Sequence, residues 1–236
     1  RLLEMASSRR INVFGTSAKY IDSLRLSGRK PGDRFNFDNL DSILSTGSPL
    51  NEENFQFVYD YWKKSVQLSS ISGGTDIISC FALGNPNLPV YKGDLQCLGL
   101  GMNVKSYDEN GISIISEKGE LVCETPFPSM PIYFWGDKDG GKYHDAYFTK
   151  FKEKWTHGDY ISINQMGGVR IYGRSDATLN PGGVRIGTSE IYKVVEKIDG
   201  ILDSVAISKN IDGDEKILLF VKMSKELDSE TNNLIK

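Results

Sequence analysis

Three short segments of the sequence combine glycine with hydroxyl side chains, and each directly follows a predicted apolar strand. They are residues 15–17 (Gly-Thr-Ser), 45–49 (Ser-Thr-Gly-Ser-Pro) and 72–76 (Ser-Gly-Gly-Thr-Asp). Glycine lets backbone N–H groups approach a ligand, Ser and Thr can contact phosphate or metal, and the carboxylate of Asp76 can hold Mg²⁺. Each segment alone is more typical of an ordinary turn. The three together, at one edge of a sheet, make a phosphate-containing ligand an equal alternative.

Two further segments carry charged side chains. Residues 155–159 (Trp-Thr-His-Gly-Asp) set Asp159 after a predicted turn. A carboxylate there can accept hydrogen bonds from both hydroxyls of a ribose, although a plain Asx turn is the alternative. Residues 173–191 are polar and glycine-rich and contain Arg174 and Arg185, whose guanidinium groups suit phosphate. The sequence contains neither G-x-x-x-x-G-K-[ST] nor G-x-G-x-x-G, so Walker-A and Rossmann phosphate loops are excluded.

The elements that must position these residues alternate along the first third of the chain. Short apolar runs at residues 11–14, 40–44 and 66–71 predict strands, and helical spacing at residues 17–26 and 51–64 predicts the helices between them. Strand-helix-strand-helix-strand at this spacing predicts βαβ units and a parallel sheet. We therefore expect a mixed α/β fold.

The pattern changes twice further along. Residues 93–131 lack a helical period and contain a hairpin signal at 108–111, so we expect a small antiparallel β subdomain there, followed by a polar turn or loop at residues 138–142. A strand at residues 169–172 and a polar break precede an α+β pattern. Its elements are a helix from Thr188 to about residue 198, strands at 205–208 and 217–223, and a helix beginning near Lys225. We predict a large domain at 1–174 and the start of a small mobile domain at 176–236.

Composition excludes several classes of protein. The 28 basic and 31 acidic residues give a net charge of −3, which offers no electrostatic case for nucleic acid or an anionic membrane. No apolar run approaches the about 20 residues of a membrane span. Cys80, Cys97 and Cys123 match no zinc spacing, and scattered thiols are typical of a reducing compartment such as the cytoplasm. His144 and His157 are expected to make local hydrogen bonds. A serine hydrolase is disfavoured, because no Gly-x-Ser-x-Gly is present.

The motifs, taken in order, resemble the AMP-forming acyl-CoA synthetases. They are Gly47-Ser48-Pro49, Gly74-Thr75-Asp76, His157-Gly158-Asp159 and the long segment from Gly173 to Ile191. The resemblance implies that ATP activates a short carboxylic acid as an acyl-adenylate, whose acyl group then passes to coenzyme A. Residues 12–20, 44–50 and 175–185 resemble in particular the branch that activates acetoacetate. The alternative is a non-catalytic module that uses the same loops to bind a nucleotide.

The resemblance also implies which residues contact the nucleotide. The adenine would lie against Gly47, Ser48 and Pro49. The ribose hydroxyls would be held by Asp159, with Arg174 beside it. The phosphates and Mg²⁺ would lie near Gly73, Gly74, Thr75, Asp76 and Arg185, of which Thr75, Asp76 and Arg185 would be catalytic. Thr75 would contact the α-phosphate, and Asp76, where most of the family has Glu, would lie near Mg²⁺.

The same resemblance implies a hinge at Asp176, passage of the pantetheine of coenzyme A past Gly183, and an acyl pocket near Gly15 and Thr16. It implies no prosthetic group, and its partners are small molecules only. Two family parts do not occur in this sequence: a phosphate loop upstream of residue 15 and a catalytic lysine beyond residue 236. We therefore expect the chain to be an internal part of a longer enzyme, and to be inactive by itself.

Overall fold

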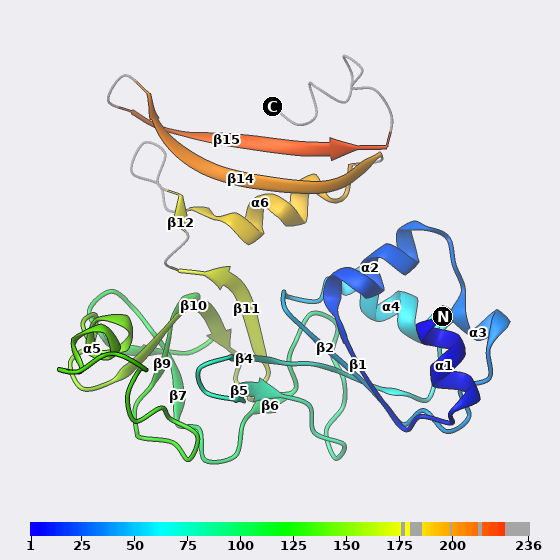
Figure 1. The fold of residues 1–236 in the computed structure, drawn as a ribbon, viewed down its shortest axis with the longest axis horizontal. Helices are drawn as coiled ribbons and strands as arrows, with labels where there is room; N and C mark the ends of the chain where they lie inside the picture. Colours follow the sequence, from blue (N-terminus) through cyan, green and yellow to red (C-terminus); the bar gives the residue numbers. More distant parts are fainter. Residues whose placement is uncertain (176–177, 180–185, 199, 212–213, 225–236) are drawn as a thin grey trace. The chain divides into compact units, whose positions relative to one another are not determined.

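The computed structural model describes residues 1–175, 178–179, 186–198, 200–211 and 214–224, and these form two compact units (Figure 1). The first unit comprises Arg1–His157 and Ile161–Ile171, and the second comprises Gly158–Tyr160 and Tyr172–Lys236. Helices and strands are mixed in both units, as the sequence predicts. No helix in the described part of the chain combines the length and the apolar character that crossing a bilayer requires.

A parallel sheet with strand order β1-β2-β3 opens the first unit (Figure 1). Its strands are β1 (Val13–Ser17), β2 (Ser42–Thr46) and β3 (Gln67–Ser70), and the helices around them are α1 (Leu2–Ser8), α2 (Ala18–Leu26), α3 (Pro31–Arg34) and α4 (Glu52–Tyr61). The helices α2 and α4 connect the strands and bury Ile21 and Val58 in one core with Ile43 and Leu68. The βαβ units are confirmed, so the carboxyl ends of the three strands meet at one edge.

A second, antiparallel sheet follows directly in the chain. Its strands are β4 (Ser72–Gly74), β5 (Ser79–Leu83) and β6 (Cys97–Leu98). The sequence did not predict this sheet, because two of its strands are only two or three residues long and β4 consists of a serine and two glycines. Residues 72–74 of the candidate segment 72–76 therefore form a strand rather than a loop.

A third sheet has the order β11-β10-β9-β7-β8. Its strands are β7 (Val104–Tyr107), β8 (Ser113–Ile114), β9 (Gly119–Cys123), β10 (Trp155–Ile163) and β11 (Val169–Arg174). The hairpin predicted around residues 108–111 is confirmed, since Tyr107 pairs with Ser113. The sheet extends beyond residues 93–131, because Trp155, Ile161 and Ile163 pack in one apolar cluster with residues of β7 and β9. The helix α5 (Gly141–Tyr147) begins where only a polar turn was expected.

The described part of the second unit contains a helix and two strand pairs. Its elements are β12 (Thr178–Leu179), β13 (Ile186–Gly187), α6 (Thr188–Val195), β14 (Ile201–Ile211) and β15 (Asp214–Met223). The predicted helix from Thr188 and the two later strands are confirmed, and the strands are longer than predicted, pairing from Ile201↔Met223 to Ile211↔Asp214. The helix expected near Lys225 lies outside the described residues.

Candidate functional site

The ends of β1 and β2 form an open edge of the parallel sheet. Gly47 follows β2 directly and has φ +86°, a conformation that favours glycine. A side chain at Gly47 would meet only the Cβ of Ser17, at 3.9 Å. Gly47 and Ser48 are exposed, and Pro49 is half-buried. The predicted adenine segment is therefore accessible to a ligand.

Gly15 and Thr16 lie within β1 rather than in a loop after it, which corrects the sequence interpretation. The strand continues to Ser17, because Gly15, Thr16 and Ser17 pair with Leu44, Ser45 and Thr46 of β2. Ser17 is the N-cap of α2, and its side chain accepts a hydrogen bond from the backbone N–H of Tyr20 at 3.1 Å. The Ser17 hydroxyl thus has a structural role. Gly15 is exposed, and a Cβ added to it would meet no atom within 4 Å.

Thr75 and Asp76 occupy the tip of the hairpin between β4 and β5. The sequence placed them in a loop after β3, but residues 72–74 pair with β5, and the N–H of Ile78 donates to the carbonyl of Thr75 at 3.3 Å. Gly73 is required for this pairing, since a Cβ there would lie 2.0 Å from the carbonyl oxygen of Ser79. The fully buried Ile77 anchors the tip, while Thr75 and Asp76 are exposed.

The imidazole of His157 packs against the backbone of Gly74. A Cβ at Gly74 would lie 2.8 Å from Cε1 of His157 and 3.4 Å from its Nε2. The indole N–H of Trp155 donates to Nδ1 of His157 at 3.4 Å, and the rings of Phe81 and His157 pack edge to face with their centroids 4.8 Å apart. His157 is buried, and it makes the local hydrogen bond that the sequence predicts.

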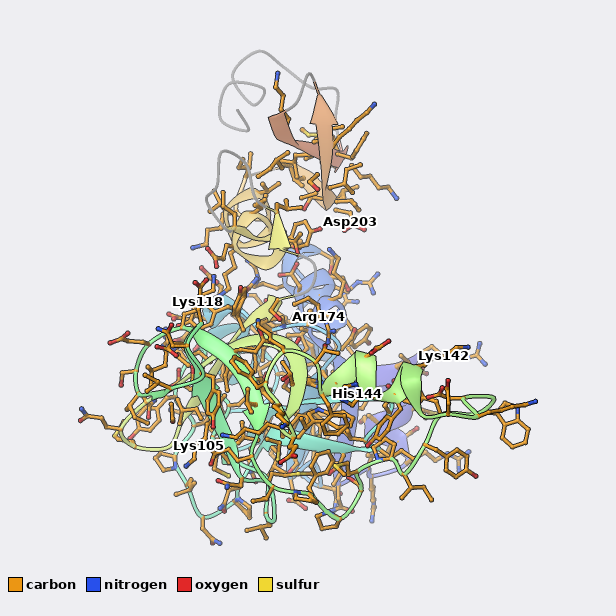
Figure 2. All side chains as sticks on the ribbon, turned by 90° about the vertical axis from the view of Figure 1, so that its left-hand side faces the viewer. Lys105, Lys118, Lys142, His144, Arg174 and Asp203 are labelled. Carbon is orange, nitrogen blue, oxygen red and sulfur yellow. The ribbon has the colours of Figure 1, made fainter. Side chains whose placement is uncertain are left out.

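The carboxylate of Asp76 is held by Tyr147, a residue that sequence reasoning missed. The phenol of Tyr147 donates a hydrogen bond to Oδ2 of Asp76, and its ring stacks on Trp155 with centroids 3.6 Å apart and an interplanar angle of 14°. Tyr147 is the last residue of α5, the helix on which Lys142 and His144 are labelled in Figure 2. The sequence signal that could have identified this helix is the pair Tyr143 and Tyr147, whose i, i+4 spacing places both side chains on one helix face.

In the second unit the structure brings Asp159 and Arg174 together. Asp159 lies inside β10, not after a turn as expected, and the strand runs through Gly158 at φ +81°. Nη1 of Arg174, labelled in Figure 2 at the end of β11, lies 3.5 Å from Oδ1 of Asp159. The two segments are also joined by the N–H of Ser175, which donates to the carbonyl of Gly158 at 2.8 Å. Asp159 is only 7% exposed, whereas the side chain of Arg174 is 47% exposed.

Three predicted site residues lie outside the described residues: Asp176, Gly183 and Arg185. Their implied roles as hinge, pantetheine passage and phosphate contact therefore stay predictions.

The described residues fit Mg²⁺ only as an ion shared with a ligand. Among them, no group of three or more His, Cys, Asp or Glu side chains could hold a metal ion. Magnesium is commonly bound by one or two carboxylates together with substrate phosphates and water. Asp76 offers this arrangement, because it is exposed and only its Oδ2 takes part in a hydrogen bond within the described chain. Asp76 can therefore contribute one oxygen to Mg²⁺ bound to phosphate.

Cys123 is buried, and Cys80 and Cys97 are half-buried. Burial raises the pKa of the Cys80 and Cys123 thiols above their ordinary value, so both thiols are neutral at physiological pH. All three cysteines are free. Neither of two cavities in the first unit, one bounded by Ala6 and Leu40 and one by Leu3 and Pro31, is lined by a candidate residue.

The comparisons with known proteins first concern the fold. No family model matches the chain. The fold resembles that of the solved anthranilate CoA ligase AuaEII in complex with anthranoyl-AMP, which matches with a TM-score of 0.78, over 99% of this chain and 44% of that chain. The two sequences are 16% identical, so this likeness concerns the fold alone.

The more similar relatives are acetoacetyl-CoA synthetases. The Rhizobium meliloti (strain 1021) protein is 50% identical over 224 residues, covering 95% of this chain and 34% of the relative. The Mus musculus protein is 50% identical over 216 residues, covering 91% and 32%. The solved enzyme from Streptomyces lividans matches with a TM-score of 0.88 at 38% identity, over 99% of this chain and 36% of that chain. The resemblance inferred from the motifs is confirmed, and the chain spans about a third of the length of these curated relatives.

Proposed function

We propose that the protein that carries this chain is an acid–thiol ligase. It activates a short carboxylic acid, for which we propose acetoacetate, with ATP and Mg²⁺, and it transfers the acyl group to coenzyme A. The products are acyl-CoA, AMP and pyrophosphate. The choice of acid is supported by the relatives, which are acetoacetyl-CoA synthetases at 45–50% identity.

The observation that carries this proposal is the exposed carboxylate of Asp76 at the tip of the β4–β5 hairpin, with one oxygen held by Tyr147. Attack of a carboxylate on ATP joins two anions, so the site must neutralise negative charge and hold the reactants in line. When bound, Mg²⁺ supplies positive charge there. Asp76 would bind and orient this ion, and Thr75 beside it would contact the α-phosphate.

The remaining site residues receive the following proposed roles. Gly47, Ser48 and Pro49 border the adenine, and Gly73 and Gly74 shape the hairpin below the phosphates. Asp159 accepts hydrogen bonds from the ribose hydroxyls beside Arg174. Arg185 contacts phosphate, Gly183 lets the pantetheine pass, Asp176 is the hinge between the two half-reactions, and Gly15 and Thr16 lie near the acyl pocket.

We also propose a cytoplasmic location and small-molecule partners only. The location is supported by the three free cysteines, which are typical of a reducing compartment.

The test is an ATP–pyrophosphate exchange assay of the full-length protein with acetate, propionate, butyrate and acetoacetate. We expect exchange that depends on the acid and is fastest with acetoacetate, together with acetoacetyl-CoA formation when coenzyme A is added. ATP binding without exchange for any acid would support the alternative, a non-catalytic nucleotide-binding module.

A further inference from the structure

Within the described part of the chain, one side-chain hydrogen bond fixes the orientation of the Asp76 carboxylate, and it comes from Tyr147. An Asp carboxylate rotates broadly about its last side-chain bond, so its two oxygens can exchange places unless a neighbour holds one of them. The phenol of Tyr147 donates to Oδ2, which leaves Oδ1 directed elsewhere. A hydrogen bond from a hydroxyl to an ionised carboxylate is among the stronger kinds in proteins.

The ring of Tyr147 is itself held in place by packing. Its ring stacks on Trp155, which is 1% exposed and whose N–H donates to His157. His157 in turn packs against Gly74, two residues before Asp76. The hairpin that carries Asp76 is therefore held by the contact of His157 with Gly74, and the Asp76 carboxylate is held by Tyr147.

Hydrogen bonds also hold the start of α5. The carboxylate of Asp137 accepts hydrogen bonds from the backbone N–H groups of Lys142 and Tyr143, at 3.2 and 2.9 Å. The phenol of Tyr143, one helical turn before Tyr147, donates to the carbonyl of Pro131 at 2.5 Å. Tyr143 thus anchors the same helix through Pro131 rather than through Asp76.

We propose that Tyr147 is a positioning residue that presents Oδ1 of Asp76 to the magnesium ion of Mg–ATP. This inference rests on the proposed function and deepens it. Hydroxyl groups that hydrogen-bond to a metal-binding carboxylate orient it, and their removal typically costs about 10- to 100-fold in metal affinity or activity. Tyr147 acts through Asp76 and does not itself contact the reacting atoms.

The experiment compares Tyr147→Phe with Tyr143→Phe in the full-length protein. Each variant loses one phenol oxygen from the same helix, and the oxygen lost from Tyr147 is the one that bonds to Asp76. Exchange with acetoacetate is measured against Mg²⁺ concentration, and ATP binding is measured by calorimetry at fixed Mg²⁺. We expect Tyr147→Phe to raise the half-saturating Mg²⁺ concentration about 10- to 100-fold and to weaken Mg²⁺-dependent ATP binding. Saturating Mg²⁺ should restore most of the rate, and Tyr143→Phe, which only loosens the same helix, should change the Mg²⁺ requirement much less than Tyr147→Phe does.

A second comparison uses Asp76→Asn as the background. There Tyr147→Phe should have little further effect on the Mg²⁺ requirement, because the carboxylate that Tyr147 orients is gone. If the wild type exchanges but Tyr147→Phe keeps its Mg²⁺ requirement, the inference is wrong while the proposed function stands. An equal loss in both Phe variants that Mg²⁺ does not restore also overturns it, since that pattern indicates a packing role. Absence of exchange in the wild type instead contradicts the proposed function.

Discussion

Asp76 in the first unit and Asp159 in the second are carboxylates held in opposite ways. Asp76 is exposed at a hairpin tip, and its partner, the phenol of Tyr147, is neutral. Asp159 is 7% exposed, and its partner is the cationic guanidinium of Arg174. The neutral partner leaves a full negative charge, which suits a cation. The cationic partner compensates the charge, which suits neutral donors such as ribose hydroxyls.

The strength of the ion pair between Asp159 and Arg174 is consistent with this difference between the two carboxylates. Nη1 of Arg174 and Oδ1 of Asp159 are 3.5 Å apart, which is longer than the about 2.7–3.2 Å of an ordinary N–H···O hydrogen bond. The kind of partner, rather than the carboxylate itself, distinguishes the proposed metal site from the proposed ribose site.

Asp76→Asn should have the largest effect, because it removes the charge and keeps the shape. Removing a single group that stabilises the transferring charge commonly costs about 10²–10³ in rate, so we expect acetoacetate-dependent exchange to fall by that factor. The control is Asp145→Asn, an exposed carboxylate on α5. A comparable loss in Asp145→Asn, or exchange at the wild-type rate in Asp76→Asn, contradicts the assignment of Asp76.

Asp159→Ala should act on ATP binding and leave the Mg²⁺ requirement unchanged. Two hydrogen bonds to a charged acceptor would be lost, at about 1.5–3 kcal/mol each before compensation. We expect the KM for ATP to rise about 10- to 100-fold, with a smaller change in kcat. Measurement of both parameters across Mg²⁺ concentrations separates this variant from Asp76→Asn. An unchanged KM for ATP, or a raised Mg²⁺ requirement, would remove the distinction between the two carboxylates.

Gly74→Ala tests whether packing holds the Asp76 hairpin. A Cβ at Gly74 would lie 2.8 Å from Cε1 of the buried His157, so one of the two must move. Overpacking of this kind typically costs about 1–3 kcal/mol, which is several degrees in Tm for a chain of this size. Gly15→Ala is the matched control in the parallel sheet, since no atom lies within 4 Å of its Cβ position. Equal Tm values for the two variants would show that the His157 contact does not constrain the hairpin.

Much of the parallel-sheet part was predictable from sequence, for a physical reason. Its strands and helices are local patterns, with apolar runs such as residues 40–44 and a helical face that includes Phe55. The motifs likewise pointed to Asp76, Asp159 and Arg174, and the structure brings Asp159 and Arg174 together. Periodicity and spacing carry this information within about ten residues of each position.

The contacts that hold Asp76 in place were not predictable from the sequence, because they join segments that are distant in the chain. Tyr147 lies 71 residues from Asp76 in the chain. Its helix begins at Gly140 and Gly141, which normally signal a turn, and it is capped from outside the helix by Asp137. Asp159 was misplaced for a related reason, since Gly158 suggested a turn but lies within β10.

Asp137→Asn should give the smallest effect, and one that depends on pH. Hydrogen bonds from the backbone N–H groups of Tyr143 and Lys142 hold the pKa of Asp137 below its ordinary value. A lowered pKa in the folded state means that the ionised cap stabilises α5 fully above the unfolded-state pKa of about 3.9, and that this stabilisation is lost as pH falls through the lower folded-state pKa. Asn resembles the protonated acid, so the variant should differ from the wild type only above this range.

The measurement for Asp137→Asn is amide hydrogen exchange of residues 141–148, compared between variant and wild type at each pH. At neutral pH the variant should exchange faster, because α5 opens more often without its charged cap. The difference should shrink as pH falls below about 4. Asp145→Asn, which removes an exposed charge from the same helix, should not reproduce this pH dependence. Since α5 carries Tyr147, Asp137→Asn should also raise the Mg²⁺ requirement slightly, by less than Tyr147→Phe. A difference in exchange that is constant with pH would show that the charge of Asp137 does not hold the helix that orients Asp76.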